Sequence, residues 1–244
     1  MWNSKAAREQ CWEIFRQAYP NYVNEDERYL QKLRALATPE TRVLDAGCGW
    51  TLPFARQLAT QVREVVGVDL GIDFEPPEPN VRAVQGNLER MPLESASFDL
   101  VMSRSVLEHL DHPDAVFLEI ARVLKPGGHF VFLIPNFYDY VSLASWMVPN
   151  HLHGLLVELV QGRDRRDTFP THYRANTVPR LQELCHISGM ALEEAQLLSQ
   201  YPAYLMFSPL LFRAGIAWDQ LLTRHDALAF LRSWILGVAR RLPV

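Results

Sequence analysis

The sequence contains few cysteines, and they show no paired spacing. Cys11, Cys48 and Cys185 are the only three among 244 residues, and they lie far apart. Disulfide frameworks and zinc clusters need more cysteines, or cysteines at short regular intervals. We therefore expect three buried thiols in a protein of a reducing compartment.

Long hydrophobic runs and a secretory signal are also missing. The first ten residues contain Lys5, Arg8 and Glu9 with no apolar core behind them. The uncharged stretches at 140–157 and 195–212 both contain proline and several polar residues, so neither has the composition of a membrane span. These features favour a cytoplasmic protein.

Positive charge is too sparse in this sequence for a nucleic-acid-binding protein. The formal net charge is −4, and only the part after Gln161 is mildly basic. Nucleic-acid-binding domains usually carry a dense basic surface. We therefore predict no nucleic-acid partner. Hydrophobic residues make up 48% and charged residues 21%, which excludes disordered, collagenous and coiled-coil chains.

Short apolar runs alternate with amphipathic stretches in the middle of the chain. The runs are Arg42–Ala46, Glu64–Asp69, Val81–Gln85, Phe98–Ser103 and His129–Pro135. Parallel strands are buried on both faces and therefore give continuous apolar runs, with helices covering the sheet. The pattern predicts the α/β fold class, with a mostly parallel sheet flanked by helices.

Additions surround this predicted core, residues 41–136. Residues 1–40 form an N-terminal helical extension, whose second helix begins at the capping pair Asn24 and Glu27. Residues 137–176 are a helical and aromatic insertion on the substrate side. Residues 177–244 complete the fold, starting with a helix capped by Thr177.

The tail of the chain combines apolar periodicity with positive charge. Leu228, Leu231, Ile235 and Val238 recur at helical spacing among arginines, which predicts an amphipathic C-terminal helix. Such a helix packs on its own domain or a dimer mate, or it lies on an anionic membrane surface. Peripheral contact with the inner face of a membrane is therefore the alternative to a purely cytoplasmic protein.

Two glycines follow the first apolar run, at Gly47 and Gly49. Glycine lets the backbone approach a ligand closely. A dinucleotide-binding loop needs a third glycine where this chain has Leu52, so a dinucleotide is disfavoured. The next run ends at Asp69, twenty residues after Gly49, and its carboxylate can accept both hydroxyls of a ribose. The pattern predicts a site for a nucleoside without a diphosphate.

These residues resemble motifs I and II of class I S-adenosylmethionine-dependent methyltransferases. Within that family the chain is most similar to the bacterial small-molecule group, whose core is similar to that of ubiquinone-pathway methyltransferases. Further matches are Val84–Leu88, Met91–Leu93, Ser97–Val101, Val106–Leu110 and Val123–Gly128. The resemblance covers residues 41–136 and implies a Rossmann-like fold, S-adenosyl-L-methionine as the cofactor, and methyl transfer. It places Asp45, Gly47 and Gly49 beside the methionine moiety, Asp69 on the ribose, and Asn87 and Leu88 at the adenine.

The chain departs from the family pattern at two places. Trp50 and Thr51 stand where a further glycine is usual, and Asn87 stands where an aspartate is usual. An asparagine carbonyl can still accept a bond from the adenine amino group. The favoured function is methylation of a small-molecule, saccharide or lipid-linked acceptor, at oxygen. A non-catalytic cofactor-binding or scaffold protein is the alternative, and Leu52 disfavours a nicotinamide-dependent oxidoreductase.

Two histidines are candidates for the base that removes a proton from a hydroxyl acceptor. His109 follows the fourth apolar run, at the sheet edge where open α/β folds bind ligands. His172 lies in the polar segment 169–177, where Tyr173 would orient an acceptor and Arg174 would pair with its carboxylate or phosphate. The alternative is that both segments are structural, as a braced helix start and an ordinary loop.

Other candidate ligands for a metal or an acceptor are weaker. Metal-binding relatives place an acid three residues before the position of Glu108, where this chain has Ser105. We therefore predict no metal site. His151 and His153 are two residues apart and would not share a helix face, so we interpret them as structural. The sequence leaves the oligomeric state open.

Overall fold

The computed structural model describes residues 5–49, 51–72, 78–147 and 170–243. The chain divides into two compact units, which we call the helical unit and the sheet unit. The helical unit comprises Met1–Glu25, Asn136–Pro170 and Leu197–Trp234, and the sheet unit comprises Asp26–Pro135, Thr171–Gln196 and Ile235–Val244.

The sheet unit is built on a seven-stranded sheet in the order β3-β2-β1-β4-β5-β7-β6. The strands are β1 (Arg42–Ala46), β2 (Glu64–Asp69), β3 (Val81–Gln85), β4 (Phe98–Arg104), β5 (Leu124–Pro135), β6 (Met190–Leu198) and β7 (Trp234–Arg241). The pairs β2–β3, β1–β2, β1–β4 and β4–β5 are all parallel. The prediction of an α/β, Rossmann-like and mostly parallel sheet is confirmed.

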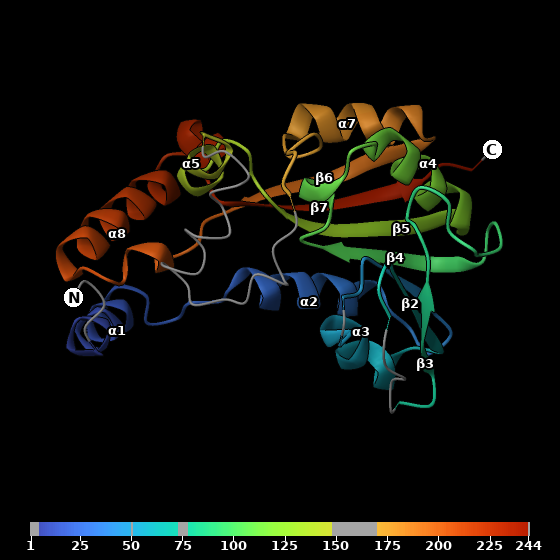
Figure 1. Ribbon diagram of the computed structural model, residues 1–244, viewed down its shortest axis with the longest axis horizontal. Coiled ribbons are helices and arrows are strands. Elements are labelled where there is room, and N and C mark those ends of the chain that lie inside the picture. Colours follow the sequence, from blue (N-terminus) through green and yellow to red (C-terminus); the bar gives the residue numbers. More distant parts are fainter. Residues whose placement is uncertain (1–4, 50, 73–77, 148–169, 244) are drawn as a thin grey trace. The chain divides into compact units, whose positions relative to one another are not determined.

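Helices cover both faces of this sheet (Figure 1). Helices α2 (Glu25–Leu36) and α3 (Pro53–Leu58), the latter continued by the 3-10 turn η1 (Ala59–Gln61), lie on one face. Helices α4 (Pro113–Val123) and α7 (Val178–Ile187) lie on the other. Phe117 of α4 packs on the Phe130 ring of β5 with centroids 5.6 Å apart, and both side chains are fully buried. Continuous apolar strands are thus sealed from water on both sides.

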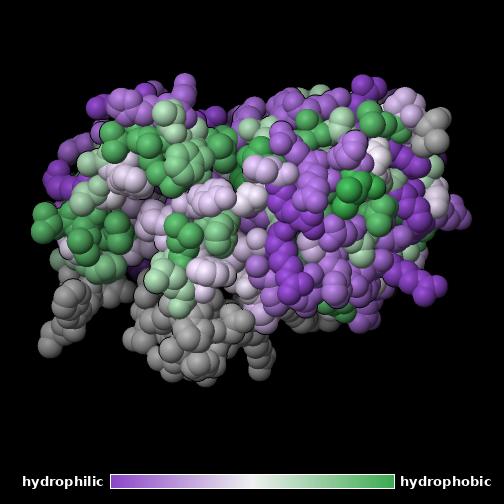
Figure 2. Space-filling view, turned by 90° about the horizontal axis from the view of Figure 1, so that it is seen from above, coloured by the Kyte–Doolittle hydropathy of each residue, from purple (hydrophilic) through white to green (hydrophobic). Residues whose placement is uncertain are grey.

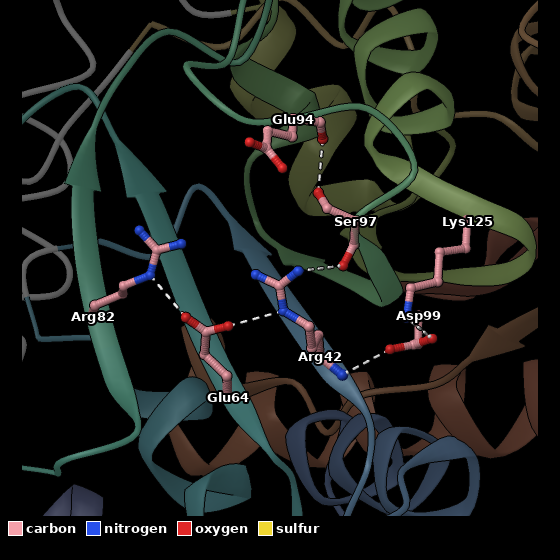
Figure 3. A network of polar contacts seen from close by, with 7 residues as sticks. All are labelled: Arg42, Glu64, Arg82, Glu94, Ser97, Asp99 and Lys125. Atoms are coloured by element: carbon pink, nitrogen blue, oxygen red, sulfur yellow. Dashed lines mark hydrogen bonds and ion pairs between the residues drawn. The ribbon is translucent and has the colours of Figure 1, made fainter.

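A network of ion pairs ties the amino ends of the strands together (Figure 3). Glu64 at the start of β2 accepts hydrogen bonds from Arg42 Nε and Arg82 Nε, both at 2.9 Å. Asp99 accepts from the backbone N–H of Arg42 at 2.9 Å and pairs with Lys125 Nζ at 2.6 Å. Residues of β1 to β5 are thereby joined at one edge of the sheet.

Strand β5 begins earlier than predicted. It starts at Leu124 rather than His129, because Leu124 already pairs with Phe98 of β4 before the register shifts and His129 pairs with Leu100. The ladder between β4 and β5 is therefore irregular at residues 125–128, which precede the strand that the sequence predicted.

The tail is a strand, so the prediction of an amphipathic C-terminal helix is wrong. Residues 226–231 form the 3-10 segment η5 (Asp226–Leu231), and β7 then inserts between β5 and β6. Gly237 allows close packing there, since a Cβ at this position would lie 2.1 Å from Cζ of Phe132. The periodicity from Leu228 to Val238 spans the break between two elements. Membrane contact through a C-terminal helix therefore loses its structural basis.

The helical unit contains α1 (Lys5–Ala18), α5 (Tyr140–Met147), the 3-10 turn η4 (Ala203–Leu205), α8 (Pro209–Arg224) and η5. Helix α1 packs on α8, with Cys11 and Ile14 of α1 and Phe212 and Ile216 of α8 buried in one cluster that also includes Met206. None of the helices in the described ranges has the length and hydropathy needed to cross a membrane.

The prediction of three buried thiols is confirmed, because all three cysteines are free and buried. Other sequence predictions concern residues that the structure does not describe. His151 and His153, predicted to be structural, lie outside the described residues, as does Trp50. The division of the chain at residues 40, 136 and 176 stays a prediction.

Candidate functional site

The predicted cofactor residues lie at the carboxyl ends of neighbouring strands. The chain proceeds from β1 through β2 to β3 on one side and from β4 to β5 on the other, so the direction of winding reverses between β1 and β4. Open α/β sheets bind ligands in the crevice at such a reversal. Asp45 lies near the end of β1, Asp69 ends β2, and His109 follows β4.

The two glycines of the turn after β1 differ in what surrounds them. Both have positive φ, +80° at Gly47 and +65° at Gly49. A Cβ on Gly47 would lie 2.4 Å from Cγ2 of Val106, so packing within the protein already demands glycine there. Apart from its two chain neighbours, no residue that the structure describes has an atom within 4 Å of a Cβ built on Gly49. Gly49 therefore borders the space that a ligand can approach.

Asp69 fixes this turn in place. Its Oδ2 accepts a hydrogen bond from the Gly49 backbone N–H at 2.8 Å, and its Oδ1 lies 3.5 Å from the backbone N of Gly71. A carboxylate offers about four lone-pair positions, so these bonds leave capacity for ribose hydroxyls. The structure thus brings together the second glycine and the acid predicted to bind the ribose.

Asp45 is a buried carboxyl beside this turn. Burial, and then repulsion from the Asp69 carboxylate, raise the pKa of Asp45 to about 8. Tyr29 of α2 is fully buried. Its pKa is raised first by this burial and then by the charge of Asp45, so the two side chains are close. A buried acid next to another acid is costly to ionise unless a cation neutralises it.

Asn87 and Leu88 form a tight turn after β3. Asn87 Oδ1 accepts from the backbone N–H of Glu89 at 2.9 Å, while Leu88 is 9% exposed. The asparagine carbonyl that was predicted to accept from adenine therefore also stabilises its own turn. Its second lone pair remains compatible with the predicted bond.

A second buried acid follows β4. Glu108 lies in the 3-10 turn η2 (Leu107–His109), is 5% exposed, and its Oε2 has no hydrogen-bond partner. Burial raises the pKa of the Glu108 carboxyl to about 7. His109 is partly exposed, with Nε2 3.9 Å from Glu108 Oε1. The segment that carries His109, for which a braced helix start was the alternative interpretation, thus contains a buried carboxyl oxygen without a hydrogen-bond partner.

The segment that carries His172 docks directly on this turn. The backbone N–H groups of His172 and Tyr173 both donate to the carbonyl of Glu108, at 2.7 and 3.1 Å. Asp111 joins the side chains, because its Oδ1 lies 3.5 Å from His172 Nε2 and its carbonyl accepts from Arg174 Nη1 at 2.5 Å. The structure therefore brings the two candidate bases to one edge, which the sequence treated as separate sites.

Strained backbone conformations gather at the same edge. Four non-glycine residues in the described ranges have positive φ. Leu52 follows the glycine turn, Ser105 follows β4, and Tyr173 docks on Glu108, whereas Ala96 precedes β4. Such conformations cost about 1–3 kcal/mol each and are often found at functional sites.

No trio of His, Cys, Asp or Glu suited to a metal ion occurs in the part of the chain that the structure describes.

Comparison with known proteins addresses the centre of the chain. Residues 44–132 match the family model described as a methyltransferase domain. This segment is a methyltransferase domain. A solved S-adenosylmethionine-dependent methyltransferase from Mesorhizobium loti shares the fold, with a TM-score of 0.60 at 20% identity over 88% of this chain and 97% of that one.

Two curated relatives of the methyltransferase domain have related names. A 24-methylenesterol C-methyltransferase from Oryza sativa is 31% identical over 160 residues, 59% of this chain and 40% of the relative. A probable S-adenosylmethionine-dependent methyltransferase from Mycolicibacterium smegmatis is 31% identical over 156 residues, 62% of this chain and 52% of the relative. The chain thus spans about half the length of these relatives. The predicted class I family is confirmed for this domain, and S-adenosylmethionine is the cofactor that the comparisons imply.

Sequence reasoning missed three residues that the structure places at the candidate site. Asp111 connects His172 with Arg174, and Tyr29 in the N-terminal extension is close enough for the Asp45 charge to raise its pKa, after burial. For Glu108 the sequence offered only the alternative of a braced helix start and did not indicate its buried, unpartnered oxygen. An acid two residues after a candidate histidine is a weak signal that would have pointed to Asp111.

Proposed function

We propose that this chain is an enzyme that transfers a methyl group from S-adenosylmethionine to an oxygen atom of a small-molecule, saccharide or lipid-linked acceptor. The observation that carries the proposal is the open approach to Gly49, whose N–H is held by Asp69, where the winding of the sheet reverses. A nucleoside fits there with its ribose on Asp69. The methyltransferase domain at 44–132 supports the same cofactor.

The electrostatics of the edge suit this cofactor. S-adenosylmethionine carries positive charge on its sulfonium and its ammonium group, and when bound it supplies an activated methyl group. Asp45 and Glu108 are buried carboxyls whose pKa values are raised to about 8 and about 7, mainly by burial. A cationic ligand offers the neutralising charge that these groups lack. Asp45, Gly47, Gly49, Asp69, Asn87 and Leu88 are the proposed cofactor residues.

His172 is the better placed of the two candidate bases. Asp111 lies 3.5 Å from its Nε2 and can hold the imidazole in one orientation, as an acid does for the histidine of a catalytic triad. His109, with Glu108 beside it, is the second candidate base. Tyr173 and Arg174 lie on the same docked segment and would orient the acceptor. Alignment and exclusion of water by these residues supply much of the acceleration that an in-line methyl transfer needs.

The names of relatives support the acceptor class only in part. The Oryza relative is named for a sterol acceptor and for transfer to carbon. A relative from a Methylovorus species is named malonyl-[acyl-carrier protein] O-methyltransferase. The proposal of transfer to oxygen therefore rests on the histidines at the site. A hydroxyl acceptor needs such a general base to remove its proton, whereas a carbon nucleophile does not need a base in the same way.

Isothermal titration with S-adenosylmethionine and S-adenosylhomocysteine tests the cofactor, and an acceptor panel with labelled methyl tests the reaction. We expect binding of both ligands, and label transfer to at least one hydroxyl-bearing acceptor. Binding without transfer across the panel would support the non-catalytic alternative. Binding of a nicotinamide dinucleotide in place of S-adenosylmethionine would refute the proposal.

A further inference from the structure

Helix α8 has apolar side chains on two opposite faces. On its inner face Phe212 and Ile216 are buried against α1 within the helical unit. On its outer face Leu210, Trp218 and Leu221 are exposed at 77%, 40% and 41%. A helix that is apolar all round is normally buried on all sides. Among the residues that the structure describes, none covers the outer face of α8 as its composition would call for.

The exposed residues form a continuous stripe rather than scattered positions. Leu210, Ala214, Ala217 and Leu221 follow one another at intervals of three and four residues, with Trp218 beside them, and all five are exposed. This spacing places them on one side of a helix. We call these five residues the α8 stripe. Single exposed apolar residues are ordinary, but a contiguous stripe marks an interaction surface.

The charges beside the α8 stripe are of one sign. Arg213 and Arg224 are exposed, and the only acid in the helix, Asp219, is 7% exposed and accepts from the Tyr19 hydroxyl at 2.6 Å. Asp226, just beyond the helix, pairs with Arg232 at 3.3 Å. The outer face of α8 thus presents apolar side chains edged by arginine.

We propose that the α8 stripe docks on an anionic lipid membrane surface. An amphipathic helix with basic residues beside leucine and tryptophan lies in the headgroup region, with its apolar side chains inserted and its cations on anionic lipids. A second copy of this chain is a poorer occupant. Two α8 helices packed face to face would offer arginines to arginines, with no exposed acid on either helix to pair with them.

The same unit exposes further apolar side chains outside α8. Trp146 and Met147 end α5 and are 63% and 76% exposed. Figure 2 shows hydrophobic colour gathered at the left of the face seen from above. This surface lies outside residues 44–132, so it is separate from the methyltransferase domain. The proposal therefore stands whatever the acceptor of the enzyme is.

Cosedimentation of the full chain with vesicles tests the proposal. The vesicles are pure phosphatidylcholine, or phosphatidylcholine with added phosphatidylglycerol. We expect binding to the anionic vesicles that weakens in high salt. Leu210→Gln with Trp218→Gln should reduce binding about tenfold or more, because each change removes a membrane-inserted apolar side chain. Arg213→Glu with Arg224→Glu should remove the preference for phosphatidylglycerol, at about fivefold or more for each arginine.

Matched changes on the sheet unit serve as controls. Leu118→Gln alters a leucine of α4 that is 52% exposed, and Arg63→Glu alters an exposed arginine before β2. Both controls should bind vesicles like the unmodified chain, and circular dichroism should show every variant folded. Equal binding by all variants, or none by the unmodified chain, would overturn the proposal. So would a dimer in light scattering that only the Leu210/Trp218 variant dissociates, because the stripe would then serve a second copy.

Discussion

The two edges of one sheet treat their charges in opposite ways. At the amino edge Glu64 and Asp99 are each bound to two donors from Arg42, Arg82 and Lys125. At the carboxyl edge, Asp45 is 5% exposed beside a second acid, and Glu108 is 5% exposed with an unpartnered oxygen. The same strands thus carry a completed ionic network at one end and incompletely neutralised acids at the other.

This difference separates charges that hold the fold from charges that await a ligand. Exposed ion pairs gain little individually but fix which strand ends meet. Buried acids with raised pKa values destabilise the protein when no cation or hydrogen-bond donor is paired with them. Sites that contain such groups are frequently functional. The amino edge therefore belongs to stability and the carboxyl edge to binding and chemistry. The predictions below compare residues at one edge with matched residues at the other, and one compares two glycines within the carboxyl edge.

The largest expected effect is on turnover, from His172→Ala. We expect kcat for a hydroxyl acceptor to fall about 10²–10⁴-fold, because a general base typically contributes that much, with an unchanged Kd for S-adenosylmethionine. Rapid-mix assays with labelled methyl measure the rate. His129→Ala is the matched control near the amino edge: its ring is 28% exposed, as is that of His172, and Nε2 lies 3.8 Å from Glu193. If His109→Ala rather than His172→Ala abolishes turnover, the base lies on η2.

The next effect is on cofactor affinity, from Asp69→Ala. Asp69 and Glu64 are the two acids at opposite ends of β2. Asp69→Ala should raise the Kd for S-adenosylmethionine at least tenfold, since charge-assisted hydrogen bonds are worth about 1.5–3 kcal/mol each. Glu64→Gln should leave that Kd unchanged. Calorimetric titration of both folded variants decides, and an unchanged Kd for Asp69→Ala would refute the ribose assignment.

The strands were predictable because strands that are buried on both faces have continuous apolar sequences. β1, β2 and β3 have the predicted limits, since each run is bounded by polar or turn residues. The tail failed because Leu228, Leu231, Ile235 and Val238 satisfy a helical period by chance across two elements. Whether a short apolar segment joins a sheet depends on a distant partner, here β5 beside β7.

The cofactor site was more predictable than the acceptor site for a physical reason. Asp45, Gly47, Gly49 and Asp69 lie at the ends of adjacent parallel strands, so their sequence spacing fixes their proximity. The docking of His172 on the Glu108 carbonyl joins residues more than sixty positions apart through backbone groups, which no side-chain pattern reports.

The glycine turn offers a comparison within the carboxyl edge. Gly47→Ala should lower the melting temperature by several degrees, because a Cβ would approach Val106 to 2.4 Å at a φ of +80°, and positive φ alone costs about 1–2 kcal/mol. In Gly49→Ala the new Cβ would have no atom of the described residues within 4 Å, apart from its chain neighbours. It should melt closer to the unmodified chain and yet bind S-adenosylmethionine more weakly. Equal melting losses would show that both glycines serve packing, and calorimetry with thermal melts distinguishes the cases.

A smaller effect is the pH dependence of stability without cofactor. The pKa of Asp45 is raised from its ordinary value of 3.8 to about 8, by burial and then by Asp69. The folded protein therefore holds a proton that the unfolded chain releases, and the free energy of unfolding falls as pH rises through this window, by at most about 1.4 kcal/mol per pH unit. Asp45→Asn should flatten this slope in thermal melts. An unchanged slope would show that Asp45 is ionised in the free protein.

The smallest effect, and the opposite sign, belongs to Glu64. Burial raises the pKa of Glu64, but hydrogen bonds from Arg82 and Arg42 outweigh burial and leave the pKa below its ordinary value of 4.5. Its stabilisation is therefore present above that pH and is lost as pH falls through the lowered pKa. Glu64→Gln should cost about 0–1 kcal/mol at neutral pH, as partly exposed ion pairs do, and the difference from the unmodified chain should vanish in acid. If Glu64→Gln instead weakened cofactor binding as Asp69→Ala does, the two edges would not be functionally distinct.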